Sequence, residues 1–430
     1  MTLILSLAVA MLAGLIMSRP AKLVGFPAVT AYLIAGILIG PYCLGLLGVP
    51  GLGFSTPEQV DAVSVVSDIA LGFIAFAIGN EFRLSTLREN GKTATVIGII
   101  QAVVTSVVVD IALVVTHFII PDTLTLPAAI TLGAVAAATA PAATLMVVRQ
   151  YKAHGHLTDL LLPIVALDDA VGLVIFAVSY GVAHALQNGD IDIITIVVNP
   201  IAEIIASLLL GSAMGAVLTF IERFFHSRSK RMSMCIAAVF LTVGLSMLSF
   251  RIGPVTVSFS SLLVCMMLGT IFCNMCSYSQ ELMERTDGWT APLFILFFVL
   301  SGAGLRLDVF ADLLVIAVGL IFIVIRSLGK WSGAFISSSM MKCDGSVRKY
   351  LGITLLPQAG VALGMSLQAA EGLGDDGALV RQIVLFSVLI FELFGPLATK
   401  IALTKAGEIE PEGKTSARKE NPDLSTHRTT

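Results

Sequence analysis

Residues 160–178 read Leu160-Leu-Leu-Pro-Ile-Val-Ala-Leu-Asp168-Asp169-Ala-Val-Gly-Leu-Val-Ile-Phe-Ala-Val178. A helix formed by this run and its flanks is long and apolar enough to cross a bilayer, yet it carries two adjacent carboxylates near its middle. Each carboxylate at mid-membrane costs about 2.5–3.5 kcal/mol on insertion scales, so a counter-charge, a bound cation or a proton must accompany it. The pair therefore predicts a site that carries cations, protons or both.

The composition is that of a membrane protein along the whole chain. Hydrophobic residues make up 56% of the 430 residues and charged residues only 13%, whereas a soluble chain carries about 25%. The net charge of −3 provides no basic field for nucleic acid, and we expect no such partner. Arg19 and Lys22 follow the first apolar run, which is the wrong order for a cleaved signal peptide.

The apolar runs predict an all-α membrane protein with about thirteen transmembrane helices. Residues 1–404 form the predicted membrane transporter domain, and the polar residues 405–430 form a predicted disordered cytoplasmic tail. The predicted spans are 2–18, 22–41, 61–81, 93–119, 124–149, 158–186, 194–223, 232–250, 254–275, 290–304, 309–340, 349–370 and 380–403.

The basic residues of the loops orient these spans. If the spans alternate in direction, nearly all loop Lys and Arg residues fall on one side, and the other side receives only Arg251, Arg306 and Arg381. Basic loops remain on the cytoplasmic side of a membrane. The sequence therefore predicts a multi-pass protein of the cell's inner (cytoplasmic) membrane, with the N-terminus outside and the C-terminus in the cytoplasm.

Two of the spans carry a proline and small residues at mid-depth. The fifth contains Ala138-Thr139-Ala140-Pro141-Ala142, and the twelfth contains Leu356-Pro357-Gln358-Ala359-Gly360. The two lie an odd number of positions apart in the order of spans, the fifth and the twelfth, so their directions are inverted. Interrupted helices at corresponding positions of inverted repeats mark the binding site of a transporter. The alternative is that each proline only kinks a packed helix.

The paired aspartates predict competition between a proton and a cation. Adjacent helical residues point about 100° apart, so Asp168 and Asp169 have different neighbours. Their mutual repulsion couples their titrations. A carboxylate in this setting holds a proton or a cation, but not both, which is the basis of proton-coupled exchange. The alternative is a buried pair that serves only the architecture.

Other polar residues in the spans complete the predicted site. Arg326 and Lys330 lie four residues apart on one helical face, and one of them is expected to reach the aspartates as a counter-ion. Lys330 is the better titrating partner, although either side chain could instead snorkel to the interface. Glu392, beside Gly395-Pro396, is a predicted accessory acid.

Thr139 is a predicted ligand of the cation together with the aspartates. Unwinding of the helix near Pro141 would free backbone carbonyls beside its hydroxyl, and hard monovalent cations prefer oxygen ligands. In this reading Asp168, Asp169 and Thr139 form the metal-ion site. The bound ion is cargo, and no cofactor is expected.

The same residues resemble the second branch of the cation:proton antiporters, which includes bacterial sodium/proton and potassium/proton exchangers. The resemblance covers nearly all of residues 1–404, and the paired aspartate is its most specific motif. The motifs that carry it are Gly25-Phe-Pro27 with Gly36-Ile-Leu-Ile-Gly-Pro41, Thr139-Ala-Pro141, Leu167-Asp168-Asp169, Arg326-Ser-Leu-Gly-Lys330 and Gly395-Pro-Leu-Ala-Thr-Lys400.

The resemblance implies the sodium/proton antiporter fold, with two broken helices that cross. It implies a mobile core domain (about 93–186 and 309–403), a scaffold that dimerises (the remaining spans), and elevator-like alternating access. By the same resemblance Asp169 is the main carrier and Asp168 pairs with the eleventh-span cation, foremost Lys330. The chain departs from a related branch at Ala140, where those relatives have Asp, and its two basic residues leave the counter-ion open.

The predicted function is secondary antiport of Na⁺, with Li⁺ or K⁺ as alternatives, against protons, by a homodimer that is not an enzyme. A gated potassium-efflux system or an ion-responsive sensor is an alternative and would need a regulatory partner. A remote alternative is an intramembrane aspartyl protease, because Gly372-Leu-Gly-Asp375 matches the Gly-x-Gly-Asp signature. That chemistry requires Asp375 to be buried opposite another aspartate.

Overall fold

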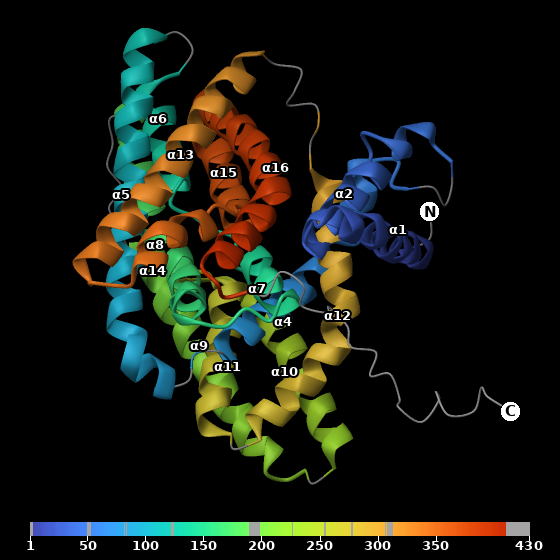
Figure 1. The fold of residues 1–430 in the computed structure, drawn as a ribbon. Coiled ribbons are helices and arrows are strands. Elements are labelled where there is room, and N and C mark those ends of the chain that lie inside the picture. Colours follow the sequence, from blue (N-terminus) through green and yellow to red (C-terminus); the bar gives the residue numbers. More distant parts are fainter. Residues whose placement is uncertain are drawn as a thin grey trace, which may run out of the picture.

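The computed structural model is almost entirely helical (Figure 1). It describes residues 3–49, 53–80, 82, 84–121, 124–188, 198–225, 227–252, 255–276, 278–305, 307 and 313–409. Its helices are α1 (Leu3–Val24), α2 (Ala28–Ile39), the 3-10 helix η1 (Leu44–Leu47), α3 (Pro57–Asp61), α4 (Ser64–Asn80), α5 (Leu84–Ile119), α6 (Leu126–Val135), α7 (Pro141–Gln150), α8 (His156–Asn188), α9 (Asn199–Glu222), α10 (Arg228–Ser246), α11 (Ser261–Met275), α12 (Ser279–Gly304), α13 (Leu313–Met340), α14 (Gly345–Thr354), α15 (Gly360–Gly372) and α16 (Gly374–Lys405).

Each predicted span contains one of these helices or, in the fifth and twelfth spans, a pair of short ones. By length and composition, 7 helices among the described residues could each cross a membrane. The shorter apolar helices are Ser64–Asn80, Leu126–Val135, Ser261–Met275, Gly288–Gly304 and Gly360–Ala370. The all-α membrane fold is therefore confirmed, and the number thirteen stays a prediction.

Both predicted interruptions are present. Residues 136–140 are unwound between α6 and α7, and residues 355–359 are unwound between α14 and α15. Pro141 occupies the first position of α7, where its missing N–H costs no helical hydrogen bond. The two unwound segments touch, since the amide of Ala140 donates to the carbonyl of Pro357 at 2.8 Å. The alternative that each proline only kinks a continuous helix is wrong.

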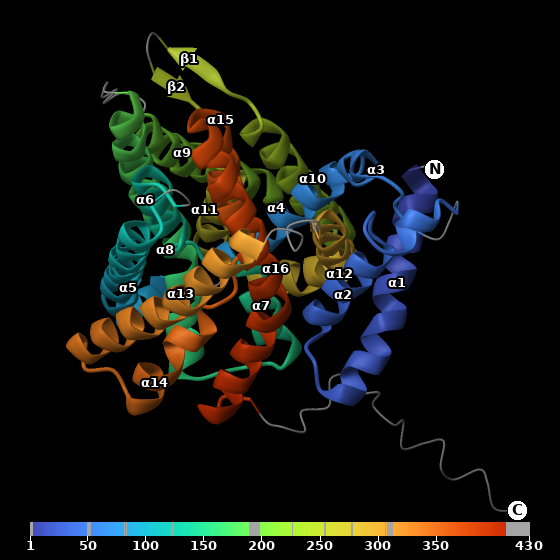
Figure 2. The same cartoon turned by 90° about the horizontal axis from the view of Figure 1, so that it is seen from above.

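The helices pack in two groups. The flanking helices are α1, α2, α4 and α9 to α12, and the central helices are α5 to α8 and α13 to α16. The unwound segments lie among the central helices, which cover the ranges predicted for the mobile core. Figure 2 shows α3 and the β1–β2 hairpin at one end of the molecule and α14 at the other. These are the ends predicted to face outside and inside.

One short segment of the predicted helical spans is a hairpin. Strands β1 (Phe250–Ile252) and β2 (Val255–Val257) pair antiparallel, with Phe250 opposite Val257. Residues 250 and 255–257 fall in the predicted eighth and ninth spans, so the helical prediction is wrong there. The β-branched run Val255-Thr-Val257 favours a strand. Arg306, one of the predicted outer-side residues, lies outside the described residues.

The start of the predicted tail is packed against the helix that carries the aspartates. Helix α16 continues to Lys405, and Glu408 is largely buried. The Glu408 carboxylate accepts from the amide of Leu157 at 2.7 Å, from the amide of Thr158 at 2.8 Å and from the Thr158 hydroxyl at 2.6 Å. The predicted disorder therefore does not begin at residue 405, because these donors at the start of α8 bind the carboxylate. Residues 410–430 lie outside the described part of the chain.

Candidate functional site

Helix α8 places both aspartates inside the protein. Asp168 is 0% exposed and Asp169 is 1% exposed. As their adjacency on a helix predicts, the two side chains have different surroundings. Four central elements meet here, namely α5, α8, α13 and the unwound segment 136–140.

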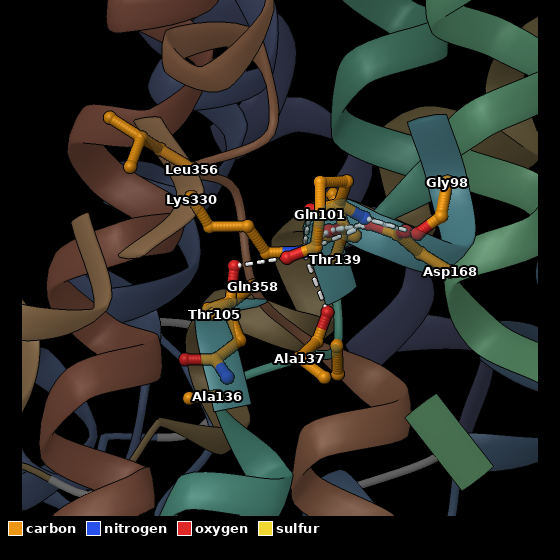
Figure 3. Close-up of polar contacts among 12 residues, drawn as sticks. Gly98, Gln101, Thr105, Ala136, Ala137, Thr139, Asp168, Lys330, Leu356 and Gln358 are labelled. Atoms are coloured by element: carbon orange, nitrogen blue, oxygen red, sulfur yellow. Dashed lines mark hydrogen bonds and ion pairs between the residues drawn. The ribbon is translucent and has the colours of Figure 1, made fainter. Parts of the chain in front are cut away.

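Asp168 has donors on both carboxylate oxygens. Lys330 Nζ lies 2.9 Å from Oδ2 and forms a fully buried ion pair with it. The Thr139 hydroxyl donates to the same oxygen at 2.6 Å, and Gln101 Nε2 donates to Oδ1. Figure 3 shows these side chains converging from separate elements. Asp168 is thus a fully satisfied anion.

Lys330 is held by acceptors on every side. In addition to Asp168, its ammonium donates to the carbonyl of Ala137 at 2.7 Å, to the Thr139 hydroxyl at 2.8 Å and to Gln101 Oε1 at 3.2 Å. The side chain is 0% exposed, so the alternative that it snorkels to the interface is wrong.

Asp169 differs from its neighbour. Neither of its carboxylate oxygens has a hydrogen-bond partner among the described residues, although both oxygens are buried. A buried carboxylate without donors is costly. Such a group in a native protein is expected where a ligand or a proton supplies the missing contacts. The arrangement therefore separates a fixed aspartate from one that is available for binding.

Each of the three guanidinium nitrogens of Arg326 donates to a backbone carbonyl. Nε donates to Ala136 at 3.0 Å, Nη2 donates to Ala138 at 2.6 Å, and Nη1 donates to Leu356 at 2.8 Å. These carbonyls belong to the two unwound segments, which lack helical partners there. Of the two predicted counter-ions, Lys330 pairs with Asp168 and Arg326 holds the helix interruptions together.

The remaining predicted residues of the broken helices surround the same crossing. Gln358 Nε2 donates to the carbonyl of Val135 at 3.0 Å, which ties the second interruption to the end of α6. Pro141 and Gly360 begin α7 and α15, and Pro357 accepts from Ala140 as described. The helix N-termini bring partial positive charge to the crossing and the ends of α6 and α14 bring partial negative charge.

A cavity of about 540 Å³ reaches this crossing from between the flanking and central helices. Thr139 and Pro141 line its inner end, whereas neither aspartate does. The described charged residues that line it are all acidic: Asp61, Asp68 and Glu392. Residues of α3 and of the first turns of α4 and α11 also line it, so it lies toward the end that carries α3 and the hairpin.

Glu392, the predicted accessory acid, lies in the wall of this cavity. It is 4% exposed, and the Ser301 hydroxyl of α12 donates to it at 3.2 Å. The structure therefore places Glu392 at the contact between α16 and α12 and away from the Asp168 network.

At the other end, direct contacts close the same interface. Lys400 Nζ of α16 donates to the carbonyl of Gly25 at 2.6 Å, and Gln150 of α7 accepts from the amide of Ala28 at 2.8 Å. The Lys400 ammonium also lies 5.0 Å from the centre of the Tyr151 ring. We call Gln150, Lys400 and the turn 25–28 the clasp.

Gln101 was not among the predicted site residues. It is 0% exposed and contacts both Asp168 and Lys330. The available signal was a single side-chain amide in the middle of the apolar run 93–119. Polar side chains at mid-membrane seek partners on other helices, but the sequence does not identify them.

The protease alternative is not supported. Asp375 is exposed at the start of α16, so it is not buried opposite another aspartate. Within the described residues, no group of three or more His, Cys, Asp or Glu side chains could hold a metal ion. A transported monovalent cation would instead rely on carboxylate, hydroxyl and carbonyl oxygens.

Comparisons with known proteins agree with this fold. The family model described as sodium/hydrogen exchanger, transmembrane, matches residues 7–405. A structure of the sodium proton antiporter MjNhaP1 from Methanocaldococcus jannaschii at pH 8 superposes with a TM-score of 0.68 at 17% identity, covering 94% of this chain and 97% of that one. An electron-microscopy structure of the same antiporter gives 0.68 at 16% identity, covering 93% and 94%. A comparison with curated protein sequences gives no significant match.

Proposed function

We propose that this chain, which belongs to the transmembrane sodium/hydrogen exchanger family, exchanges a monovalent cation for protons by alternating access. The family is that of transmembrane exchangers, and the long apolar helices fit a multi-pass membrane protein. In our proposal Na⁺ is the principal cargo, and Asp169 is the group that a cation and a proton occupy in turn.

The observation that carries this proposal is the contrast between the two aspartates. Asp168 receives hydrogen bonds on both oxygens, and Asp169 receives none from the described residues. Lys330 pairs with Asp168 and the Arg326 guanidinium is bound to backbone carbonyls, so the Asp169 carboxylate has no bonded partner among the described residues. A charge buried without a partner is costly, so a cation or a proton must balance it. Occupancy by one then excludes the other.

The oxygen atoms of the proposed site suit a hard cation. Its carboxylate, the Asp168 carboxylate, the Thr139 hydroxyl and the carbonyls of the unwound segment belong to the ligand class that Na⁺, Li⁺ and K⁺ share. Loss of a proton from Asp169 would create the charge that the cation needs. The exchange therefore requires no cofactor, since the competing ions are themselves the substrates.

The cavity and the clasp support alternating access. The cavity leads to Thr139 from the α3 end, while the clasp closes the opposite end of the same interface. Movement of the central helices along the flanking helices would break the clasp and move the site to the other side. We propose that the flanking helices form the scaffold of a homodimer, and that the α3 end faces outward from the cytoplasmic membrane.

Exchange in proteoliposomes tests the proposal. A proton gradient is imposed, Na⁺, Li⁺ or K⁺ is added, and the internal pH is followed for the wild type and for Asp169→Asn. We expect cation-driven proton movement in the wild type and none in Asp169→Asn. Asp375→Asn, at an exposed carboxylate of α16, is the matched control and should behave as wild type. Full exchange by Asp169→Asn would refute the assignment.

A further inference from the structure

We propose that Gln101 is a positioning residue. Its amide keeps Asp168 in the ion pair with Lys330, so that Asp169 is the carboxylate that binds a cation and a proton in turn. This inference rests on the proposed function, because it explains why only one of two adjacent acids exchanges its ligand. Gln101 lies in α5, 67 residues before Asp168 and 229 residues before Lys330. It is the part of the network that touches both members of the ion pair with a single amide group.

The hydrogen bonds of Gln101 define the orientation of its amide. Nε2 donates to Asp168 Oδ1 and to the carbonyl of Gly98 at 3.1 Å, while Oε1 accepts from Lys330 Nζ at 3.2 Å. A reversed amide would place its NH₂ group against the ammonium and its oxygen against the carboxylate. Both contacts would then be repulsive. The amide is therefore matched to a charged Lys330 and an ionised Asp168 (Figure 3).

Gln101 supplies the contact that distinguishes Asp168 from Asp169. Oδ2 of Asp168 is bound by Thr139 and Lys330, but Oδ1 receives its donor from Gln101. Without that donor, one oxygen of Asp168 would be as bare as those of Asp169. The compact ammonium of a lysine on its flexible stem could then be shared between the two acids.

The packing of α5 against α13 places Gln101 within reach of Lys330. A Cβ atom at Gly333 would lie 2.8 Å from the carbonyl oxygen of Gln101 and 3.0 Å from its Cα. A Cβ atom at Gly329 would lie 3.2 Å from the Cα of Thr105. The two glycines flank Lys330 in sequence and lie on the face of α13 that meets α5. This close approach lets the short amide bridge the two helices.

The charged groups that determine the pH response come from two helices. Asp168 and Asp169 face the network from α8, and Lys330 and Arg326 face it from α13. The unwound segment contributes carbonyls and the Thr139 hydroxyl, which carry no formal charge. Loss of the Gln101 donor removes a hydrogen bond that favours the ionised form of Asp168, so the pair should release its proton at higher pH.

Exchange assays on Gln101→Met and Gln101→Leu test the proposal. Met keeps the length of the side chain and Leu shortens it, and neither offers a donor to Asp168 or an acceptor to Lys330. For both variants we expect the pH of half-maximal exchange to rise by about one unit, and the apparent KM for Na⁺ at fixed pH to change about tenfold. A purely structural role would lower the melting temperature and the amount of protein, but not move the pH profile.

Thr105→Val is the matched control for this series. Thr105 is buried one turn further along α5, and its hydroxyl donates to the backbone carbonyl of Gln101 at 2.7 Å. Valine keeps its volume, so the pH profile should stay that of the wild type.

The outcomes separate this inference from the proposed function. A wild-type pH profile in either Gln101 variant overturns the inference. If Gln101→Met does not fold, Gln101→Leu supplies the decisive profile. Asp169→Asn is measured in the same vesicles. If it is inactive while the Gln101 variants behave as wild type, only the role of Gln101 is refuted; if it is active, the proposed carrier is refuted.

Discussion

Lys330 and Asp168 form an ion pair in which Nζ lies 2.9 Å from Oδ2 and both side chains are 0% exposed. They come from α13 and α8, 162 residues apart in the chain. In a low-dielectric interior, the cost of desolvating two charges offsets much of their attraction. Each charge is therefore stable in the interior only while its partner is present, because the remaining charge would otherwise be buried alone.

Removal of either half should destabilise the protein more than removal of both. Lys330→Met or Asp168→Asn leaves one buried charge without its partner, which costs about 3–5 kcal/mol. The double variant removes both charges and should recover part of this loss. Thermal unfolding in detergent measures the effect as a change in melting temperature.

Asp169→Asn is the control for that series, because its carboxylate has no hydrogen-bond partner among the described residues. Its melting temperature should stay close to that of the wild type or rise. Additive losses in the Asp168→Asn/Lys330→Met double variant would contradict the coupling of the pair.

Arg326→Lys should fail to replace arginine although it keeps the positive charge. The guanidinium donates to Ala136, Ala138 and Leu356 at once, and a lysine ammonium cannot match that planar geometry. Each orphaned carbonyl costs about 1–3 kcal/mol. Hydrogen exchange at the amide of Ala140, which bonds Pro357, should become faster as the crossing loosens.

Ser327→Ala is the control for Arg326→Lys. The Ser327 hydroxyl bonds the carbonyl of Ile323 within α13, one turn back, and does not contact the crossing. Hydrogen exchange at Ala140 should be unchanged in this variant. Equal protection in Arg326→Lys and wild type would show that the three carbonyls do not depend on the guanidinium.

Lys400→Met should weaken the clasp and favour conformations that open at the 25–28 end. The lost bond from Lys400 to Gly25 involves a charged donor, so the population of such conformations should rise by about tenfold. A cysteine placed at Thr30, which is 4% exposed, reports this opening through maleimide labelling on a background without the native cysteines.

Lys405→Met is the matched control for the clasp, since Lys405 is exposed at the end of the same helix. It should leave the labelling of Thr30→Cys unchanged. Labelling that is no faster in Lys400→Met than in this control would mean that the clasp does not hold the end closed.

Glu408→Ala should destabilise the start of α8. The carboxylate binds the amides of Leu157 and Thr158 at the helix N-terminus, where a negative charge is also favourable. Loss of such a cap costs about 0.5–2 kcal/mol. The melting temperature should fall, and the amides of Leu157 and Thr158 should exchange faster.

Gly155→Ala tests the same contact from the other side. Gly155 has φ +147°, and a Cβ atom there would lie 2.5 Å from the Glu408 carboxyl carbon. The substitution should therefore displace Glu408 and give a loss at least as large as Glu408→Ala. A melting temperature unchanged in both variants would rule out a stabilising role for Glu408.

The helix interruptions could be predicted because their causes are local. A proline removes a backbone donor and clashes with the preceding turn, and Pro141 and Pro357 also lie among small residues in inverted spans, so they indicated the interruptions before any packing was known. A proline alone does not break a helix here, since Pro163, Pro292 and Pro396 lie inside α8, α12 and α16. The hairpin at 250–257 was missed because an apolar run of this length does not distinguish a strand from a helix end. The donors that hold Glu408 belong to a helix about 250 positions earlier in the chain, which no local pattern reveals.

The amino-acid sequence by itself determined that this chain enters a membrane and that Asp168 and Asp169 need positive partners there, because transfer free energies belong to residues and not to their contacts. Only the tertiary structure decided that Lys330 pairs with Asp168, that Arg326 binds the unwound backbone, and that Gln101 joins the network. Each of these choices depends on the directions of side chains from helices far apart in sequence. Those directions are fixed only when the helices pack.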